Sequence, residues 1–395
     1  WPAERRSFTR KQLDEISAIK QRHARTCLNP SASLRVNPSQ SSCHDLLLTE
    51  TLPGLVSILI PFRDRVELTK TCVHSLQANA SDSVPFEIIL IDNGSEEDCT
   101  KAWIQEITQS TNIHCLRIDE PFNFSRLNNL ARKVCNGDHL LFLNNDIEFL
   151  SPNVLNQLLD PFAHPGTAAV GTRLLYPDRS IQHQGVVIIK GERRCVLEPG
   201  KHLHQPEVID GLIPLKVQEE FSAASAACLL VKADRFDAIG GFNEELAVVF
   251  NDVDLCLRLR EDGGHIVVTP HPTIIHHESV SRGKDLEGKA WARHQRESGL
   301  LRKNHAALYA HGDPLTSPHL HHHSNRYEPA PPPPSAIGPV REQVLYSWQR
   351  STKGSDSRPV LIFAQYSDEP SNSIRTDVLA LLKIYRRHFY VVVVA

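Results

Sequence analysis

The side chains of this sequence that could do chemistry are carboxylates and amides placed just after short apolar runs. They occur in three groups, Asp92-Asn93, Asn144-Asn145-Asp146 and Asn251-Asp252. Oxygen atoms of this kind can hydrogen-bond a nucleoside, bind a hard cation such as Mg²⁺ or Mn²⁺, or accept a proton as a general base. The sequence has no G-x-S-x-G elbow, no P-loop, and no G-x-G-x-x-G after its first apolar run. It therefore predicts neither a serine nucleophile nor a dinucleotide site.

We expect Asp146 to bind a divalent cation, Mg²⁺ or Mn²⁺, because it is the only acidic residue in the polar group after the apolar run Leu140–Leu143. These cations are often held by one or two carboxylates together with the phosphates of a substrate. A further donor could be His277, with its neighbour His276 as the alternative, or His277 could be a core histidine. Arg282, in a basic loop, would then help to neutralise a diphosphate.

Two carboxylates have a structural interpretation beside the functional one. Asp92 could hold a turn through its own backbone, or it could bind a base or ribose. Asp252 could cap a helix expected from about Asp252 to Glu261, or it could act as a general base. Because a helix start favours the ionised form, we expect a lowered pKa for Asp252. Asp254, two residues on, is expected to be structural.

Apolar runs alternate with segments of helical period from Leu55 onward, a pattern typical of βαβ units. Strands are expected at Leu55–Ile60, Phe86–Ile91, Ile113–Ile118 and His139–Leu143, and helices at Val66–Ala78 and Ser125–Val134. Right-handed units of this kind give an α/β fold with a mostly parallel sheet flanked by helices. Ligands bind outside the carboxyl ends of such strands, which is where the first two polar groups stand.

The remaining chain is expected to supply the second wall of a cleft, a linker and part of another domain. Further strands are expected at Ala226–Lys232, Ile266–Val268 and Thr273–Ile275. The expected domains are an N-terminal helix and linker (1–54), the main α/β domain (55–300), a Pro/His-rich linker (301–357) and the truncated start of a second α/β domain (358–395). The linker prediction rests on the tracts His319–His323 and Pro329–Pro334, which favour an extended chain.

Composition excludes several classes of protein. The 395 residues are 41% hydrophobic, and 43 Lys+Arg stand against 46 Asp+Glu, which excludes global disorder and gives no basic footprint for nucleic acid. Nine Cys without a C-x-x-C pair indicate neither a zinc ribbon nor a disulfide framework. No run approaches the roughly 18–20 apolar residues that span a bilayer, so we expect a cytoplasmic protein, at most peripheral at the inner membrane. The absence of any Met, including an initiator, leads us to expect a fragment.

Several segments resemble, in the right order, the family 2 glycosyltransferases with the GT-A fold. They are Val56–Pro61, Ile91–Ser95, Phe122–Ser125 with Asn128-Asn129, Leu141–Asp146, Leu175–Asp178 with Ile181–His183, Gly240–Asn243, Phe250–Arg258, and His276–Ser279 with Ser281–Gly283. The resemblance covers about residues 55–283. It implies a Rossmann-like half that binds the nucleotide and a second half that binds the acceptor.

The resemblance also implies roles for individual residues. The residues expected to bind the nucleotide sugar are Pro61, Arg63, Asp92, Asn93, Asn128, Asn144, Asn145 and Arg282. Asn144-Asn145-Asp146 stands in for the D-x-D metal motif, and Asp252 stands where an acidic pair supplies the catalytic base. This sequence departs from the family pattern at Asn144 and at Asn251, which replaces the more common Glu. Asp146 must therefore hold the metal more alone, and Asn251 is expected on the acceptor side.

We therefore expect a metal-dependent, inverting glycosyltransferase that moves a sugar from a nucleoside-diphosphate sugar to a glycan or lipid-linked acceptor. Residues 359–395 resemble, more weakly, the start of a rhamnan-synthesis F-type domain, which indicates a rhamnose-containing O-antigen or capsule in a bacterium. One alternative is a sugar nucleotidyltransferase, which would normally need a Gly-rich phosphate loop where Pro61–Arg65 has no Gly. The other is a non-catalytic module that binds glycan or nucleotide.

Overall fold

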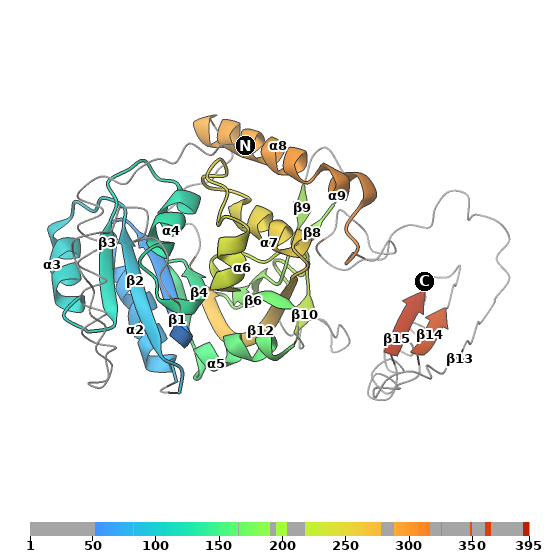
Figure 1. Ribbon diagram of the computed structural model, residues 1–395, viewed down its shortest axis with the longest axis horizontal. Helices are drawn as coiled ribbons and strands as arrows, with labels where there is room; N and C mark the ends of the chain where they lie inside the picture. The colour runs from blue at the N-terminus through green and yellow to red at the C-terminus, as the bar shows by residue number, and fades with distance from the viewer. Residues whose placement is uncertain are drawn as a thin grey trace, which may run out of the picture.

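The computed structural model describes residues 52–81, 83–164, 166–189, 195–203, 218–277, 288–316, 325, 348–349, 360–364 and 390–394. The strands of the main sheet are β1 (Leu52–Phe62), β2 (Phe86–Asp92), β3 (Ile113–Arg117), β4 (Gly137–Leu143), β5 (Ile147–Phe149), β6 (Thr167–Leu175), β7 (Ile181–His183), β10 (Glu219–Glu220), β11 (Cys228–Lys232) and β12 (His265–His276). Their order is β10-β12-β6-β11-β4-β1-β2-β3, with β5 paired to β12 and β7 to β6 (Figure 1). The sheet is mixed and mostly parallel.

The helices lie on both faces of this sheet, which confirms the predicted fold class. They are α2 (Val66–Asn79), α3 (Asp98–Ile107), α4 (Phe124–Arg132), α5 (Val154–Leu159), the 3₁₀ helix η2 (Asp160–Ala163), α6 (Ala233–Ala238), α7 (Asn251–Glu261), α8 (Gly288–Asn304) and α9 (Ala306–His311). Buried side chains of α2, α3 and α5 belong to one apolar core, and those of α4, α6 and α7 belong to another.

The first half of the sheet is built from the parallel strands β4, β1, β2 and β3. Successive side chains of a strand point to opposite faces. Ile58 and Ile60 of β1 accordingly enter the core with α2, while Leu59 enters the core with α4. Strands buried on both faces read as continuous apolar runs, which is why this half was predictable from sequence.

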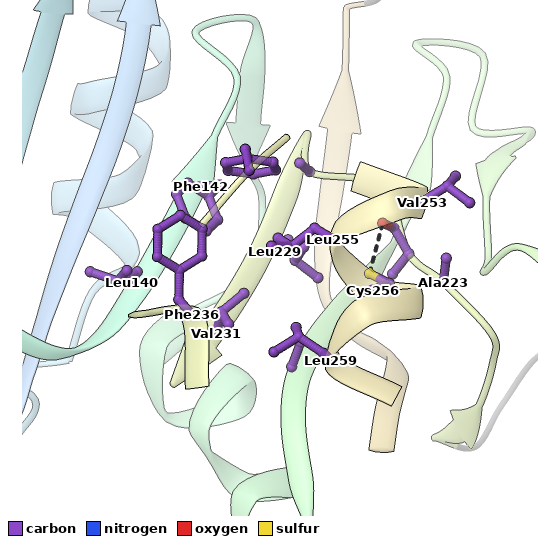
Figure 2. Close-up of a cluster of buried hydrophobic side chains, with 14 of the residues drawn as sticks. Leu140, Phe142, Ala223, Leu229, Val231, Phe236, Val253, Leu255, Cys256 and Leu259 are labelled. Atoms are coloured by element: carbon purple, nitrogen blue, oxygen red, sulfur yellow. Dashed lines mark hydrogen bonds between the residues drawn. The ribbon is translucent and has the colours of Figure 1, made fainter. Parts of the chain in front are cut away.

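The second half joins the first through β11, which pairs antiparallel with β4 on one side and with β6 on the other. Figure 2 shows the core on this side, where Phe142 of β4 packs against Phe236 of α6 with ring centroids 5.2 Å apart. Leu255 and Leu259 of α7 belong to the same core, and both are fully buried. Helix α7 is thereby fixed against the sheet.

The structure differs from the sequence expectation in several elements, and three of these differences bear on the main sheet and on the end of the main domain. Strand β6, inside the sheet, was not expected, because the small residues Ala168, Ala169 and Gly171 interrupt its β-branched residues and leave neither an apolar run nor an alternating pattern. The two short strands expected near residues 266 and 273 form the single strand β12, whose register with β6 shifts between Thr269 and Ile274. The chain also stays helical past residue 300, where the linker was expected to begin.

Outside the main sheet, β8 (Val187–Ile188) pairs with β9 (Val196–Leu197). Near the C-terminus, β13 (Trp348–Gln349), β14 (Val360–Ala364) and β15 (Tyr390–Val394) form a three-stranded sheet in which β14 and β15 are parallel. β14 and β15 lie in the segment 358–395, which was expected to begin a second α/β domain. The expected N-terminal helix, the Pro/His-rich tracts and the loop with Arg282 lie outside the described residues. Within the described part of the chain, no helix is long and apolar enough to cross a bilayer.

Candidate active site

The polar groups of the first half meet at one edge of the sheet, where β1, β2 and β4 end. These strands are parallel, and Phe62 of β1 stands beside Asp92 of β2 while Leu59 stands beside Phe142 of β4. Asn144 follows β4 directly, so its side chain lies at the same edge as Asp92. The carboxyl ends of parallel strands are the usual place for a ligand in an α/β sheet.

A short segment before β11, Ser225–Ala227, joins the candidate metal group to the candidate base. The carbonyl oxygen of Ala227 accepts a hydrogen bond from the backbone N–H of Asn144 at 2.9 Å. The N–H of Ala226 donates to Oδ2 of Asp252 at 3.1 Å. Two groups separated by more than a hundred residues of sequence therefore bond to adjacent residues of one segment, which we call the junction segment.

Asp146 faces a histidine from β12. Its Oδ1 lies 3.1 Å from Nε2 of His276, and both side chains are nearly fully buried. On the other side of the ring, Nδ1 lies 2.6 Å from Oε1 of Gln182, an oxygen that can only accept. Nδ1 therefore carries the proton, and in the neutral ring the lone pair of Nε2 is directed at Asp146.

A carboxylate oxygen and an imidazole lone pair that face each other fit a divalent cation. Gln182 fixes the orientation of the ring through its other nitrogen, as the partners of metal-bound histidines do. The amide nitrogen of Asn144 lies 3.3 Å from the same Nε2. Within the described ranges, no cluster of three or more His, Cys, Asp or Glu side chains is arranged to hold a metal. Two protein donors would leave the other coordination positions to phosphate and water.

His277, the expected ligand, is directed elsewhere. Its Nε2 lies 2.9 Å from Oε2 of Glu148, and its backbone N–H donates to the carbonyl oxygen of Asp146. Successive residues at the end of a strand point to opposite sides, so only one of the two histidines can face Asp146. In the structure that residue is His276.

Asp252 lies in the first turn of α7 but does not cap the helix. The N-cap residue is Phe250, which has a left-handed backbone with φ 60°. Oδ1 of Asp252 accepts from the N–H of Val253, and Oδ2 accepts from Ala226. Burial shields the carboxylate from water and raises the pKa of Asp252, although these N–H groups and His183 act in the opposite direction. The expected lowering of the pKa is wrong, because the loss of hydration outweighs these opposing contacts.

A buried histidine supports the junction segment from behind. Nε2 of His183 accepts hydrogen bonds from the N–H groups of Gly185 and Ser225, at 3.2 and 3.1 Å. Its Nδ1 therefore carries the proton, and it lies 3.6 Å from Oε1 of Glu198. Burial alone would raise the pKa of Glu198, but the hydrogen bond to His183 and the charge of Lys201 bring it down to about 2. His183 thus fixes Ser225, and the neighbouring residue Ala226 bonds Asp252.

Asp92 has both carboxylate oxygens engaged within the protein. Oδ1 accepts from the N–H of Ser95 at 2.8 Å, and Oδ2 accepts from Nη1 of Arg117 at 2.8 Å. Arg117 also bonds Asp119. The side chain of Asp92 is 2% exposed, so in this state it holds the turn after β2. Arg117 had no role in the sequence prediction, because nothing in its local pattern indicates the partner.

The other expected nucleoside contacts divide into structural and accessible side chains. Nδ2 of Asn93 donates to the carbonyl oxygens of Ile118 and Glu120, which ties the end of β2 to the chain after β3. Pro61 is a buried residue of β1. Arg63 has 59% of its side chain exposed and lies 3.7 Å from Glu96, so it can reach a ligand from solvent.

Two further asparagines serve helix contacts. Nδ2 of Asn128 donates to the carbonyl oxygen of Phe124 one turn earlier in α4, and the side chain is fully buried. Nδ2 of Asn145 donates to Oγ1 of Thr69 in α2 at 3.1 Å. Asn145 thereby fixes the turn that presents Asp146, whereas Asn128 lies inside the helix packing.

Asp254 is structural, as expected. It is fully buried and bonds Nε of Arg258 at 2.8 Å and Nε2 of His305 at 3.0 Å. The prediction missed the roles of Gln182 and His183. The segment that contains them was noted for its resemblance, but side chains from a three-residue strand carry no signal of which distant residue they contact.

Comparisons with known proteins identify the family to which part of this chain belongs. The model of the family described as Glycosyl transferase family 2 matches residues 57–198. The Sinorhizobium fredii (strain NBRC 101917 / NGR234) protein "Uncharacterized protein y4gI" is 37% identical over 305 residues, which cover 77% of this chain and 33% of the relative. "O-antigen biosynthesis protein RfbC" of Myxococcus xanthus is 34% identical over 267 residues, which cover 67% of this chain and 20% of the relative. The chain thus spans a third or less of these two relatives.

A third relative is matched over most of its length. "N-acetylglucosaminyl-diphospho-decaprenol L-rhamnosyltransferase" of Mycobacterium tuberculosis (strain ATCC 25618 / H37Rv) is 25% identical over 246 residues, which cover 57% of this chain and 77% of the relative. Among solved structures, GalNAc-T7 with UDP, GalNAc and Mn²⁺ aligns with a TM-score of 0.44 at 15% identity, covering 72% of this chain and 56% of that one. The family match shows that this chain carries a glycosyl transferase family 2 domain over residues 57–198.

Proposed function

We propose that this chain is an inverting glycosyltransferase that moves a sugar from a nucleoside-diphosphate sugar to a glycan or lipid-linked acceptor. The proposed setting is bacterial surface-polysaccharide biosynthesis, an O-antigen or capsule that contains rhamnose. The names of the relatives from Myxococcus xanthus and Mycobacterium tuberculosis support this setting. The observation that carries the proposal is the junction segment, because it binds the Asn144 turn and Asp252 through neighbouring residues.

The proposed reaction is a single displacement with Asp252 as the general base. An acceptor hydroxyl oxygen attacks the anomeric carbon from the face opposite the diphosphate, the bond from that carbon to the phosphate oxygen breaks, and the hydroxyl proton passes to Asp252. The raised pKa of Asp252 suits this role, since a base works best when its pKa approaches the working pH. Oδ1 of Asn251 accepts from the N–H of Asp252, which leaves its amide nitrogen for the acceptor side.

The proposed donor site lies at the edge where β1, β2 and β4 end. We propose that the nucleoside lies against Pro61 and Arg63 and over the turn held by Asp92, with Asn93 fixing that turn. Of these side chains, Arg63 is the accessible one, so it is proposed to contact the ligand directly. The proposed phosphate contact of Arg282 lies outside the described residues.

We propose that Asp146 and His276 hold Mg²⁺ or Mn²⁺ together with the diphosphate of the donor. Such a cation would offset the negative charge that builds up on the departing diphosphate. Asn144 and Gln182 fix the orientation of His276, and Asn145 fixes the turn. His277 supports the same turn through its backbone N–H and through Glu148, as a neighbour of the site.

A donor screen tests the function. Purified protein is mixed with UDP-, dTDP- and GDP-sugars with and without Mn²⁺, and the melting temperature is measured, because a ligand that binds only the folded state raises it. The preferred donor is then assayed for release of nucleoside diphosphate. A nucleotidyltransferase would instead form pyrophosphate from a sugar 1-phosphate and a nucleoside triphosphate. A binding module would give a thermal shift without turnover of any donor.

We further propose that the sheet of β13, β14 and β15 begins a separate domain of the rhamnan-synthesis F type, reached through the Pro/His-rich tracts. Limited proteolysis followed by mass spectrometry tests this arrangement. We expect the first cuts between residues 317 and 347. First cuts inside residues 52–316 would contradict it. A lipid-linked acceptor would bring the protein to the cytoplasmic face of the inner membrane, which co-sedimentation with vesicles that contain such a lipid would test.

A further inference from the structure

Helix α8 contains one fully buried carboxylate that hydrogen-bonds backbone outside the helix. Glu297, in the middle of this helix, is 0% exposed. A buried charge is costly unless its oxygens are hydrogen-bonded. Oε2 of Glu297 accepts from the backbone N–H of Val249 at 2.8 Å and of Val248 at 3.2 Å. Oε1 lies 3.5 Å from Nη2 of Arg296. The helix therefore holds two backbone groups that lie just before α7.

The backbone fixed by Glu297 leads directly into the candidate base. Val249 is followed by Phe250, whose φ of 60° lies in the left-handed region that residues other than glycine rarely adopt. Strained backbone of this kind persists only where the surrounding structure dictates it. The next residues are Asn251 and Asp252. The direction in which α7 starts, and hence the position of Asp252, depends on this conformation.

Other residues at helical spacing from Glu297 contact the same segment. The ring of His294 packs edge-on against Phe250 with centroids 5.2 Å apart. Leu301 is fully buried in the core that includes α7. His305, just after α8, bonds Asp254 at 3.0 Å. α8 and the residue after it therefore hold the chain on both sides of Asn251 and Asp252.

We propose that Glu297 is a positioning residue for the base. Its carboxylate fixes the N–H groups of Val248 and Val249, these dictate the left-handed turn at Phe250, and that turn directs Asp252 toward the acceptor. Glu297 itself touches neither donor nor acceptor. This inference rests on the proposed function and deepens it, since it names a residue outside the matched family segment on which the geometry of the base depends.

Three variants of the full chain test the role. Glu297→Ala removes both acceptor oxygens, and Glu297→Gln keeps one oxygen but removes the charge. Asp262→Asn is the control, because it makes the same change of carboxylate to amide at the far end of α7, where the side chain bonds Arg235. Hydrogen exchange is measured by mass spectrometry on peptides that contain residues 246–251, and kcat and donor KM are measured with the donor found in the thermal screen.

We expect exchange in residues 246–251 to rise about 10- to 100-fold in Glu297→Ala, as loss of a charged hydrogen bond gives. A misplaced base should lower kcat by about 10- to 100-fold while the donor KM stays within about twofold. Asp262→Asn should resemble the wild type in all three readouts. If Glu297→Ala does not fold, Glu297→Gln is judged by the same readouts at a temperature where its melting curve shows it folded.

Two results would overturn the inference: unchanged exchange in residues 246–251, or raised exchange with a normal kcat. If the wild type turns over no nucleotide sugar, the proposed function fails instead, and the exchange measurement alone decides whether Glu297 fixes this segment. The two failures are therefore distinguishable.

Discussion

Replacement of Asp252 by Asn tests the base directly, because Asn keeps the shape of the side chain and cannot take a proton at neutral pH. The structure shows what else the change does. Oδ1 of the new amide can still accept from the N–H of Val253, but its amide nitrogen would then face the N–H of Ala226, where Oδ2 accepts now. Two donors would meet, and the buried N–H of Ala226 would lose its acceptor.

The expected losses of stability and of turnover can both be estimated from these contacts. An unpaired buried donor costs about 1–3 kcal/mol of the free energy of unfolding, and each kcal/mol lowers the melting temperature by about 2–4 °C in a domain of this size. Removal of a charge that is held partly out of water offsets some of that loss. Loss of a general base lowers turnover by about 10²–10⁴-fold. The expected loss of activity is therefore much larger than the loss of folded protein at 25 °C can explain.

The assay compares kcat and melting temperature in Asp252→Asn and in a matched control, Asp262→Asn. Asp262 lies at the far end of α7, where its partly exposed carboxylate bonds Arg235 at 2.7 Å. The control should keep near-normal turnover. Near-normal turnover in Asp252→Asn itself would refute the assignment. Asp254 could not then take over the role, because both of its oxygens are bonded to Arg258 and His305.

Three further predictions follow. The pKa of Asp252 lies above its ordinary value of 3.8, so kcat should fall as the pH drops through that raised pKa, and the residual activity of Asp252→Asn should lack this limb. In titrations with Mn²⁺, Asp146→Ala and His276→Ala should lose the metal-dependent part of the donor-induced thermal shift, while His277→Ala should keep most of it. An equal loss in all three variants would contradict the assignment of His276. Burial alone would lower the pKa of His305, but its hydrogen bonds to Asp254 and Glu261 raise it above 6.5. Protonated His305 therefore stabilises the folded protein fully below pH 6.5, and this stabilisation is lost as the pH rises through the raised pKa. The melting temperature of His305→Gln should fall less over that pH range than that of the wild type.

The parts of the fold that sequence could predict are those whose residues carry their own signal. Strands such as β2 and β4 are continuous apolar runs, and the residues after them stand at the ligand edge for a topological reason. β6 escaped prediction because its small residues are dictated by a neighbour that lies far along the chain. A Cβ at Gly171 would lie 2.4 Å from Cβ of Ala224. Tertiary contact sets that sequence, so no local pattern reports it.

The candidate site divides in the same way. The sequence alone shows that Asp146 and Asp252 are carboxylates at the ends of predicted elements. The residue type and this position determine which chemistry is available. The choice of His276 over His277 depends on which residue of β12 faces Gln182. The direction of the pKa shift of Asp252 depends on how far the carboxylate is removed from water, which the helix start alone cannot indicate. Contacts across elements decide both.

The small residues before β11 show why so plain a stretch of sequence can be central to the site. Ala224 packs against Gly171 of β6, and its carbonyl oxygen accepts from Sγ of Cys256 in α7 at 3.7 Å. A larger side chain at this position would push β6 and α7 apart. The following junction segment would then be unable to bond Asn144 and Asp252 at the same time. Small side chains thus let one backbone segment hold both candidate groups, and the spacing between the proposed cation site and the proposed base is set by adjacent, planar peptide units.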